Sequence, residues 1–262
     1  MSSASMPLAC SRAQLVDALD ELLQPALFRD YGPNGLQVEG RAEVRHIVSG
    51  VTASLALIDA AIAAGADAIL VHHGLFWRGQ DGRLTGWMKQ RVARLLAHDI
   101  SLIAYHLPLD AHAQWGNNAQ LGARLGWVAD DAPQGRFGEQ SLGWLGRSTV
   151  AHGSALDLAR HIETQLGRAV TCIDAPGRAP QRIAWCTGGA QSYFEAAIAA
   201  GADVFVTGEI SEPQAHSARE CGVAYIACGH HASERFGAPA VAAHIAQQLG
   251  LVHTFIDIPN PA

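Results

Sequence analysis

The chain has 262 residues, of which 49% are hydrophobic and 16% are charged, so we expect a folded globular protein and exclude a disordered one. Its formal net charge of −6 argues against broad binding to a nucleic-acid backbone, which requires clustered Lys and Arg. No apolar run approaches the roughly 20 residues that cross a bilayer, and five cysteines without a C-x-x-C pair are typical of free thiols in a reducing compartment, so we expect a cytoplasmic protein.

The first half of the chain is expected to alternate between helices and strands. Ser11 can cap a helix through about residue 24, and a helix that starts at Ser54 ends where Gly65 permits a left-handed cap. A third helix is expected at 87–98. The segments expected as strands are 46–53, 68–71 and 100–105. This alternation predicts a mostly parallel or mixed sheet with helices on both faces.

The second half repeats this order. The string AAIAAGAD occurs at 60–67 and again at 196–203, and each copy runs into a short apolar segment. The repeated elements are helices at 155–167, 192–201 and 211–221 and strands at 182–189, 204–207 and 223–229. We therefore predict two similar α/β/α lobes that arose by internal duplication, residues 1–128 and 129–262. An extra edge strand, formed where the tail 253–262 returns to the first lobe, is an open alternative for the end of the chain.

Two matching tetrads carry residues that suit a metal site. His106-x-x-x-Asp110 closes the first half, and His230-x-x-x-Glu234 closes the second. All four residues lie at or just past the ends of predicted strands, which is where open α/β sheets collect ligands. Imidazoles combined with carboxylates suit zinc, manganese or ferrous iron better than calcium. We therefore predict a two-metal site in a cleft between the lobes.

The first lobe also carries two adjacent histidines, His72 and His73, directly after the strand at 68–71. Neighbouring residues on an extended strand point to opposite faces. We therefore expect the strand to end before them, so that each imidazole holds a different ion. The matching positions of the second half are Gly208 and Glu209, which predicts an asymmetric site.

The remaining histidines carry no comparable pattern, and we interpret most of them as structural. They are His46, His98, His152, His161, His216, His244 and His253. His112 and His231 are closer to the candidate donors. His231 follows His230 as His73 follows His72, but it has no tetrad partner of its own.

Several motifs together resemble one known family. They are VHHGLFW (71–77), HLPLD (106–110), GNNAQL (116–121), TGE (207–209) and GHHASE (229–234). The chain resembles the GTP cyclohydrolase 1 type 2-like family, also called the NGG1-interacting-factor-3-like family, from YGPNGLQVEG to FIDIPNP. The resemblance implies two divalent ions per subunit (zinc, iron or manganese) and a toroidal homohexamer. The ligands that it implies are His72, His73, Asp110, His230 and Glu234, with Glu234 as the bridge.

The resemblance also implies a reaction. Water activated by the ions would attack C8 of a guanine nucleotide, open the imidazole ring and release formate. His106 is the candidate catalytic acid or base, with a supporting role beside Asp110 as the alternative. Phe76 and Trp77 could stack on a purine, although packing is the simpler interpretation, and Arg78 could meet a phosphate.

Two other functions stay open at this point. The first is a metal-dependent phosphoesterase that acts on another small molecule. The second is a non-catalytic, metal-stabilised ring that works as a scaffold or binding protein. The negative net charge disfavours a DNA clamp, whereas the open coordination that five or six ligands leave on two metals favours catalysis.

Overall fold

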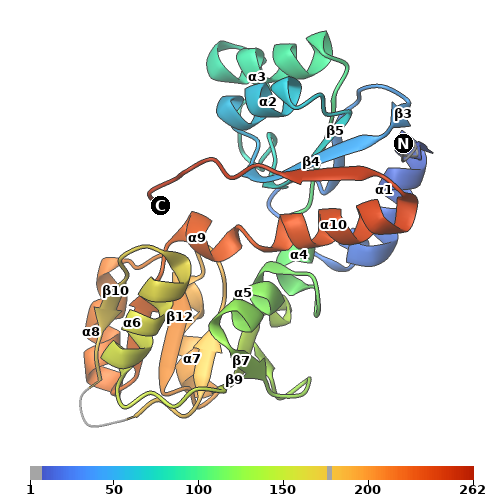
Figure 1. Cartoon of the computed structure of the whole chain (residues 1–262). Helices are drawn as coiled ribbons and strands as arrows, with labels where there is room; N and C mark the ends of the chain where they lie inside the picture. The colour runs from blue at the N-terminus through green and yellow to red at the C-terminus, as the bar shows by residue number, and fades with distance from the viewer. Residues whose placement is uncertain (1–7, 176–178) are drawn as a thin grey trace. The chain divides into compact units, whose positions relative to one another are not determined.

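The computed structural model describes residues 8–175 and 179–262 of the chain (Figure 1). These residues form two compact units, each built around its own sheet. Unit 1 contains the described residues up to Leu109 together with Gly237–Pro259, and unit 2 contains Asp110–Phe236 and Asn260–Ala262. The mixed α/β class predicted from the alternation of elements is confirmed.

The sheet of unit 1 has the strand order β14-β4-β5-β6-β2. Strands β14, β4, β5 and β6 are parallel, and β2 is antiparallel to β6. These strands are β2 (Gly35–Val38), β4 (His46–Thr52), β5 (Ala68–His73), β6 (Ser101–Ala104) and β14 (Val252–Phe255). A separate antiparallel pair consists of β1 (Cys10–Ser11) and β3 (Glu43–Val44).

Helices cover both faces of this sheet. The helical elements are α1 (Arg12–Leu23), the short 3-10 turn η1 (Pro25–Leu27), α2 (Leu55–Ala63), α3 (Gly86–Ala97) and α10 (Gly237–Leu249), and α4 (Leu107–Ala111) follows β6 at the unit boundary. Figure 1 shows α2 and α3 over one face and α1 and α10 over the other. Alternate strand residues such as Val48 and Ile69 pack with Leu57 and Leu95 of the helices. Each such buried side chain contributes roughly 1.5–3 kcal/mol.

Local sequence signals explain the helix ends. The Ser54 hydroxyl accepts the backbone N–H of Leu57 at 3.2 Å, which caps α2, and Gly65 continues beyond its end with φ +72°. Ser11 forms a capping box with Gln14 at the start of α1. The three helices expected in the first half are therefore found within one or two residues of their predicted ends.

One strand differs from its prediction. We expected the strand at 68–71 to end before the two histidines, but β5 continues through His73. The reason is that Thr52 of β4 pairs with His73, so the ladder holds both histidines. The Thr52 hydroxyl also lies 3.1 Å from His73 Nδ1.

The sheet of unit 2 has the order β10-β13-β12-β11-β9-β7, with β8 beside β9. Strands β11, β12 and β13 are parallel, whereas β10, β9 and β7 pair antiparallel with their neighbours. The strands are β7 (Trp127–Ala129), β8 (Arg136–Phe137), β9 (Gly143–Ser148), β10 (Thr171–Ile173), β11 (Ile183–Trp185), β12 (Val204–Thr207) and β13 (Ala224–Ala227). The strands β7, β8, β9 and β10 were not predicted, because three of these segments have only two or three residues and the longest, β9, contains two glycines, so none shows a clear alternation.

The helices of unit 2 surround this sheet. They are α5 (Asn117–Leu125), η2 (Glu139–Ser141), α6 (Ala155–Leu166), η3 (Gln191–Tyr193), α7 (Phe194–Ala199), α8 (Glu212–Cys221) and α9 (His230–Glu234). Its core contains Trp127, Trp144 and Trp185, which pack with Leu158 of α6 and Leu121 of α5. No helix among the described residues has both the length and the apolar character that a membrane crossing requires.

The division of the chain differs from the predicted boundary after residue 128. Residues 110–128 belong to unit 2, because Leu121 and Leu125 of α5 are buried in the same core as Trp127. The segment 237–259 belongs to unit 1, because α10 packs on β4 and β14 pairs with β4. The sequence repeat does not indicate either assignment, because it ends before α10.

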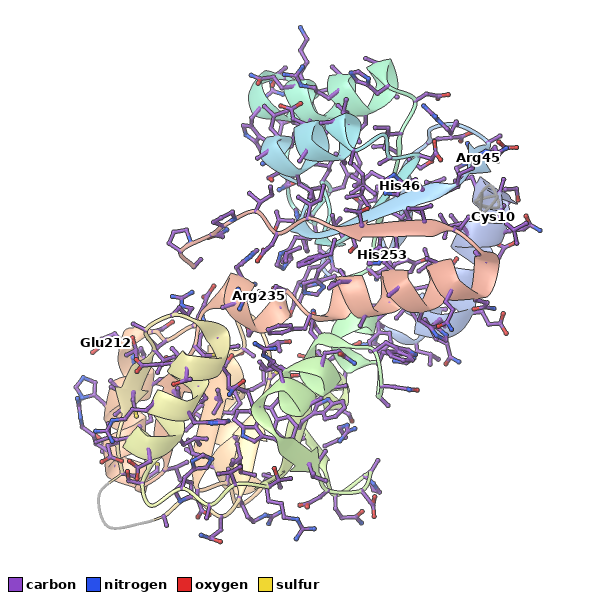
Figure 2. All side chains as sticks on the ribbon, in the orientation of Figure 1. Cys10, Arg45, His46, Glu212, Arg235 and His253 are labelled. Carbon is purple, nitrogen blue, oxygen red and sulfur yellow. The ribbon has the colours of Figure 1, made fainter. Side chains whose placement is uncertain are left out.

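The C-terminal strand β14 is fixed in unit 1 by side chains as well as by the ladder. His46 Nε2 lies 2.9 Å from the Thr254 hydroxyl, and His253 Nε2 lies 2.8 Å from the Ser49 hydroxyl. Figure 2 labels His46 and His253 on these two neighbouring strands. Burial, followed by the charge of His46, lowers the pKa of His253.

The two units repeat one topology. In unit 1 the order is α1, β2, β4, α2, β5, α3, β6, and in unit 2 it is α6, β10, β11, α7, β12, α8, β13. The spatial order β4-β5-β6-β2 matches β11-β12-β13-β10, including the antiparallel last strand. The match follows the repeat in the sequence, and it places the ends of β6 and β13 at equivalent positions.

Candidate metal centre

Unit 1 brings three imidazoles together. His72 and His73 end β5, and His106 follows β6, the neighbouring parallel strand. One nitrogen of each ring lies within 4.8 Å of the others, a grouping that could hold a metal ion. The ring centroids are 4.5 Å apart for His72 and His73 and 5.0 Å apart for His72 and His106. Both histidines therefore face the same region although the strand continues through them.

Two of these rings are held through Nδ1 by acceptors. The Nδ1 of His72 lies 3.1 Å from the carbonyl oxygen of Tyr105, and a carbonyl only accepts, so this nitrogen carries the proton. His106 Nδ1 lies 2.7 Å from an Asp30 carboxylate oxygen. A proton on Nδ1 puts the ring lone pair on Nε2. This is the arrangement in which histidines ligate metals, with a carbonyl or carboxylate behind the ring.

The loop around Asp30 positions His106. The Asp30 carboxylate accepts hydrogen bonds from the Leu107 backbone at 2.9 Å and from the Asn34 amide at 2.9 Å, and the Asn34 oxygen accepts the His106 backbone N–H at 2.7 Å. Burial alone would raise the pKa of Asp30, but the hydrogen bond and charge of His106 outweigh it, with help from Asn34 and Leu107. The pKa falls to about 2. Asp30 is therefore a buried anion that fixes the ring.

Aromatic side chains border the same histidines. The Trp77 ring meets His106 edge-on at 5.0 Å and 89°, and it lies 5.9 Å from His73. Phe76 is partly buried against the hydrophobic core of unit 1 and also lines a small cavity beside Trp77. The Arg78 guanidinium donates to the Asp30 carbonyl at 2.7 Å, so it braces the loop that holds His106.

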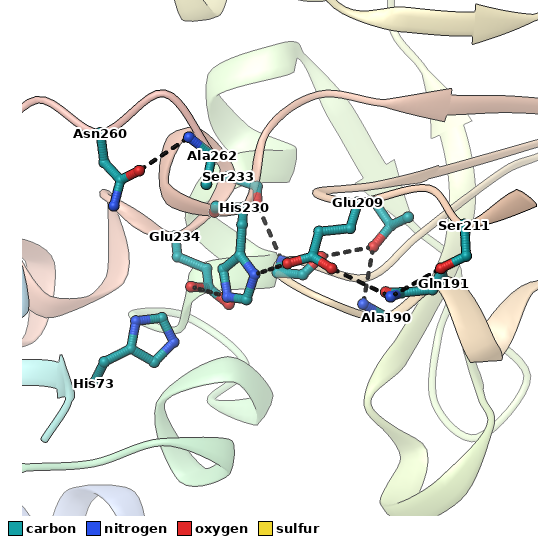
Figure 3. Close-up of polar contacts among 12 residues, drawn as sticks. His73, Ala190, Gln191, Glu209, Ser211, His230, Ser233, Glu234, Asn260 and Ala262 are labelled. Atoms are coloured by element: carbon teal, nitrogen blue, oxygen red, sulfur yellow. Dashed lines mark hydrogen bonds and ion pairs between the residues drawn. The ribbon is translucent and has the colours of Figure 1, made fainter. Parts of the chain in front are cut away.

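Unit 2 supplies carboxylates and one imidazole. His230 and Glu234 lie four residues apart on α9, and His230 Nε2 is 3.1 Å from a Glu234 carboxylate oxygen. His230 Nδ1 is 2.6 Å from Glu209 (Figure 3). Carboxylate oxygens of Asp110 and Glu234 lie within 4.8 Å of each other. His230 is therefore held through Nδ1, like His72 and His106 of unit 1.

The two carboxylates of unit 2 are nearly inaccessible, with 7% exposure for Asp110 and 2% for Glu234. Asp110 accepts hydrogen bonds from the Asn117 amide at 2.9 Å and from the Thr187 hydroxyl at 3.2 Å. Burial, followed by the charges of Asp110 and Glu234, raises the pKa of the Cys186 thiol well above its usual range. Buried negative charge of this kind is costly without a compensating cation.

A proton on the His230 ring compensates part of this negative charge. Burial lowers its pKa, but the hydrogen bonds and charges of Glu234 and Glu209 outweigh burial and raise the pKa to about 9. A group of carboxylates that attracts a proton to this ring also attracts a metal ion, which would compete with that proton. The donor set of unit 2 therefore fits a divalent cation.

A glycine makes room for the buried glutamate. Gly188 has φ +71°, and a Cβ at this position would collide with the Glu234 carboxylate. Its backbone N–H donates to the Ser233 hydroxyl at 3.0 Å, which ties the loop after β11 to α9. Any other residue at 188 would displace Glu234.

Each predicted site residue can be placed within its unit. Unit 1 groups His72, His73 and His106, and unit 2 groups Asp110, His230 and Glu234. His231 is buried, and its backbone N–H donates to the Ala262 carbonyl at 3.1 Å. The Nδ1 of His112 accepts the Trp115 backbone N–H at 2.9 Å, so this ring fixes a turn.

Two anchoring residues were not identified from the sequence. Asp30 lies in a loop dense in turn formers, and nothing in its spacing connects it with His106. Glu209 did carry a signal, because it occupies the position that the repeat matches with His73. We interpreted this difference only as a sign of an asymmetric site and gave Glu209 no role, whereas Glu209 holds His230.

Known proteins match the chain along almost its whole length. The profile of the family Duf34/NIF3 (NGG1p interacting factor 3) matches residues 10–261. A protein of Pseudomonas aeruginosa named GTP cyclohydrolase 1 type 2 homolog is 50% identical over 97% of this chain and 100% of its own length. A protein of Escherichia coli K12 with the same name is 47% identical over 95% of this chain and 98% of its own length.

Solved structures agree with the fold over the same extent. The structural-genomics protein ybgI, described as of unknown function, is 47% identical with a TM-score of 0.91, over 97% of this chain and 100% of its own. The protein TTHA1606 from Thermus thermophilus is 31% identical with a TM-score of 0.84, over 97% of this chain and 100% of its own.

Proposed function

Because the chain belongs to the Duf34/NIF3 family, we propose that it is a metal-dependent hydrolase that acts on a nucleotide. The observation that carries this proposal is the set of three imidazoles in unit 1, whose nitrogens lie within 4.8 Å of one another. His72 and His106 are fixed through Nδ1 by acceptors, which sets the ring lone pair on Nε2, for a metal in His72 and for a proton in His106.

We propose that the donors of both units bind the same pair of divalent ions. The ligands are His72, His73, Asp110, His230 and Glu234, with Glu234 as the bridge. Two considerations support joint binding. The candidate donors of unit 1 are imidazoles without a carboxylate, and those of unit 2 include a single imidazole, so neither unit alone offers enough donors for two ions of zinc, iron or manganese. In addition, Asp110 follows His106 by only four residues, so the chain itself connects the two sets of donors.

When bound, two such ions would lower the pKa of water and offset negative charge that develops on the substrate. The residues of the chain would handle the protons. His106 keeps Nδ1 bonded to Asp30, so its Nε2 can accept a proton from water and return it to a leaving nitrogen or oxygen. Trp77 and Asp30 hold the ring from two sides and fix the direction of this transfer.

The finer proposal is a GTP cyclohydrolase-like reaction, in which water opens the imidazole ring of a guanine nucleotide and C8 leaves as formate. A small cavity of about 200 Å³ in unit 1 supports a planar base. Trp77, Leu84 and Met88 supply its apolar walls, and Gln80 supplies an amide. Trp77 also contacts the His106 ring, so a base stacked there would lie next to the proposed proton-transfer group.

Incubation of the purified chain with GTP and Mn²⁺ tests this proposal. We expect formate release by the wild type and at least an about 100-fold loss in an Asp110→Asn variant, because a buried ligand is lost. Formate release that is absent from the wild type, or equal in both proteins, would contradict a cyclohydrolase. Release of phosphate that depends on Asp110 would favour the alternative phosphoesterase.

A scaffold role for a ring-shaped assembly is the remaining candidate. Exposed apolar side chains on and next to α3 support self-association, with exposed fractions of 55% for Trp87, 59% for Leu96 and 50% for Leu84. We propose a toroidal homohexamer, to be tested by light scattering of the wild type and a Trp87→Glu variant.

All five cysteines are free thiols, which supports a cytoplasmic location.

A further inference from the structure

Unit 2 contains a second cavity that shares no residue with the donors described above. Its volume is about 510 Å³, within the range of sites for small molecules. It lies where β9 ends, and the loop 149–152 forms one wall. The approach to β11 at residues 180–182 forms another wall, and Asp130 follows β7 at the rim. We call it the Arg147 pocket.

Positively charged residues outnumber negatively charged ones in the Arg147 pocket. Among the described residues of the lining, Arg147 and Arg182 are cationic and Asp130 is the single acidic one. Arg182 and Asp130 form a long ion pair at 3.3 Å, in which the two side chains are 47% and 31% exposed. Arg147 forms no ion pair with any residue in the ranges 8–175 and 179–262. The lining therefore carries one excess positive charge in a chain whose net charge is −6.

Hydrogen-bonding groups complete the wall. His152 Nε2 lies 3.2 Å from the Ser148 hydroxyl, and that hydroxyl also accepts the Val150 backbone N–H at 3.1 Å. The Thr149 hydroxyl donates to the Gly126 carbonyl at 2.8 Å. These bonds fix the loop that follows Arg147, so its shape is set before any ligand binds.

We propose that the Arg147 pocket binds a phosphorylated small molecule, with the phosphate on Arg147 and Arg182. Guanidinium groups match the geometry and charge of a phosphate dianion, and two of them without a second carboxylate favour a dianion over a simple carboxylate. The volume exceeds that of an isolated ion, so the remainder of the molecule lies against Ser148 and Thr149. The proposal is independent of the metal centre.

Isothermal titration with ribose 5-phosphate, at fixed ionic strength, tests the proposal. The background is the full-length Asp110→Asn variant, so that phosphate binding to the proposed metal centre is weakened. In this background we expect Arg147→Ala to weaken binding by about ten-fold or more, the usual value of a hydrogen bond to a charged group. Asp130→Asn should tighten binding several-fold, because it removes the negative charge that pairs with Arg182 and releases that guanidinium.

Matched controls separate the pocket from general charge. Arg219→Ala removes one exposed arginine from α8 and should leave the affinity unchanged. Ribose without phosphate should not bind. The proposal is overturned if Arg147→Ala and Arg219→Ala have equal effects, or if ribose 5-phosphate does not bind at millimolar concentration. A weaker affinity in Asp130→Asn would also overturn it. Damage to the structure of the pocket would weaken binding, whereas the loss of a negative charge should strengthen it.

Discussion

The two units share a topology but hold different donors at matching places. Unit 1 presents three imidazoles, whereas unit 2 presents one imidazole with buried carboxylates. The position that holds His73 in unit 1 holds Glu209 in unit 2, where it anchors His230 instead of serving as a candidate ligand. The repeated fold therefore determines where polar side chains are placed, and the residue type at each place determines their role.

The anchors differ in the same way. His106 is anchored by Asp30 from a loop before β2, and the Asp30 side chain is only 4% exposed. His230 is anchored by Glu209 from the end of β12, and that side chain is 43% exposed. Water can replace Glu209 more easily than Asp30, so unit 1 should depend more strongly on its anchor.

Removal of the buried carboxylate of unit 2 should have the largest effect. We expect Glu234→Gln to lose more than about 100-fold in metal affinity, because the amide has no charge and Glu234 is the proposed bridge. Equilibrium dialysis with Zn²⁺ measures this change. Glu220→Gln, on the exposed end of α8, is the matched control. Equal zinc affinity in the two variants would show that Glu234 is not a ligand.

Removal of an imidazole from unit 1 tests the other half of the comparison. His73→Ala should lose about one equivalent of metal per chain, because a neutral donor is removed while the carboxylates stay. His98→Ala, an exposed histidine after α3, should keep its full metal content. Mass spectrometry measures the metal content of both variants. An identical metal content in His73→Ala and His98→Ala would contradict the role of His73.

A comparison of the two anchors should give intermediate effects. Substitution of groups that hold a ligand usually costs about 10–100-fold in metal affinity or activity. We expect Asp30→Asn to fall at the upper end of this range and Glu209→Gln at the lower end, because Asp30 is buried and Glu209 is half-exposed. Hydrolysis rates at saturating metal would measure the difference, and the reverse order would contradict the burial argument.

The smallest expected effect is on the pH dependence of stability. It concerns the strand that pairs with β4 in unit 1 and the strand that pairs with β11 in unit 2. In unit 1 this neighbour is β14, and in unit 2 it is β9. The pKa of His253 in β14 is lowered in the folded state, so as pH falls below about 6.5 the unfolded chain binds a proton that the folded chain resists. The contribution of His253 to the free energy of unfolding should therefore decrease as the pH is lowered from about 7.5 to about 5.5.

His253→Gln should reduce this decrease, because glutamine does not titrate. Urea unfolding at the two pH values measures it, with His244→Gln on α10 as the comparison. If His253→Gln retains the full pH dependence of the wild type, the edge of unit 1 does not contribute to it.

Much of the fold follows from patterns that are local in the chain. Ser54, Gly65 and Gly201 mark helix ends through their own caps, and the copies of AAIAAGAD mark the repeat. The assignment of α5 to unit 2 and of α10 to unit 1 could not be predicted in this way. It depends on which core buries Leu121 and on the pairing of β14 with β4, contacts between residues far apart in sequence.

The candidate site shows the same limit. Histidines and carboxylates that follow strands are visible as motifs, because a parallel sheet brings strand ends together. Asp30 was not visible, since it reaches His106 across 76 residues from a loop without periodicity. The continuation of β5 through His73 was also missed, because a strand end depends on its partner, Thr52.

The central claim is that donors of both units bind one pair of ions. Electron paramagnetic resonance of the chain loaded with two equivalents of Mn²⁺ tests it most directly. We predict a spin-coupled spectrum that becomes that of isolated Mn²⁺ in either His73→Ala or Glu234→Gln. Two uncoupled ions in the wild type, or coupling that survives both substitutions, would contradict the claim.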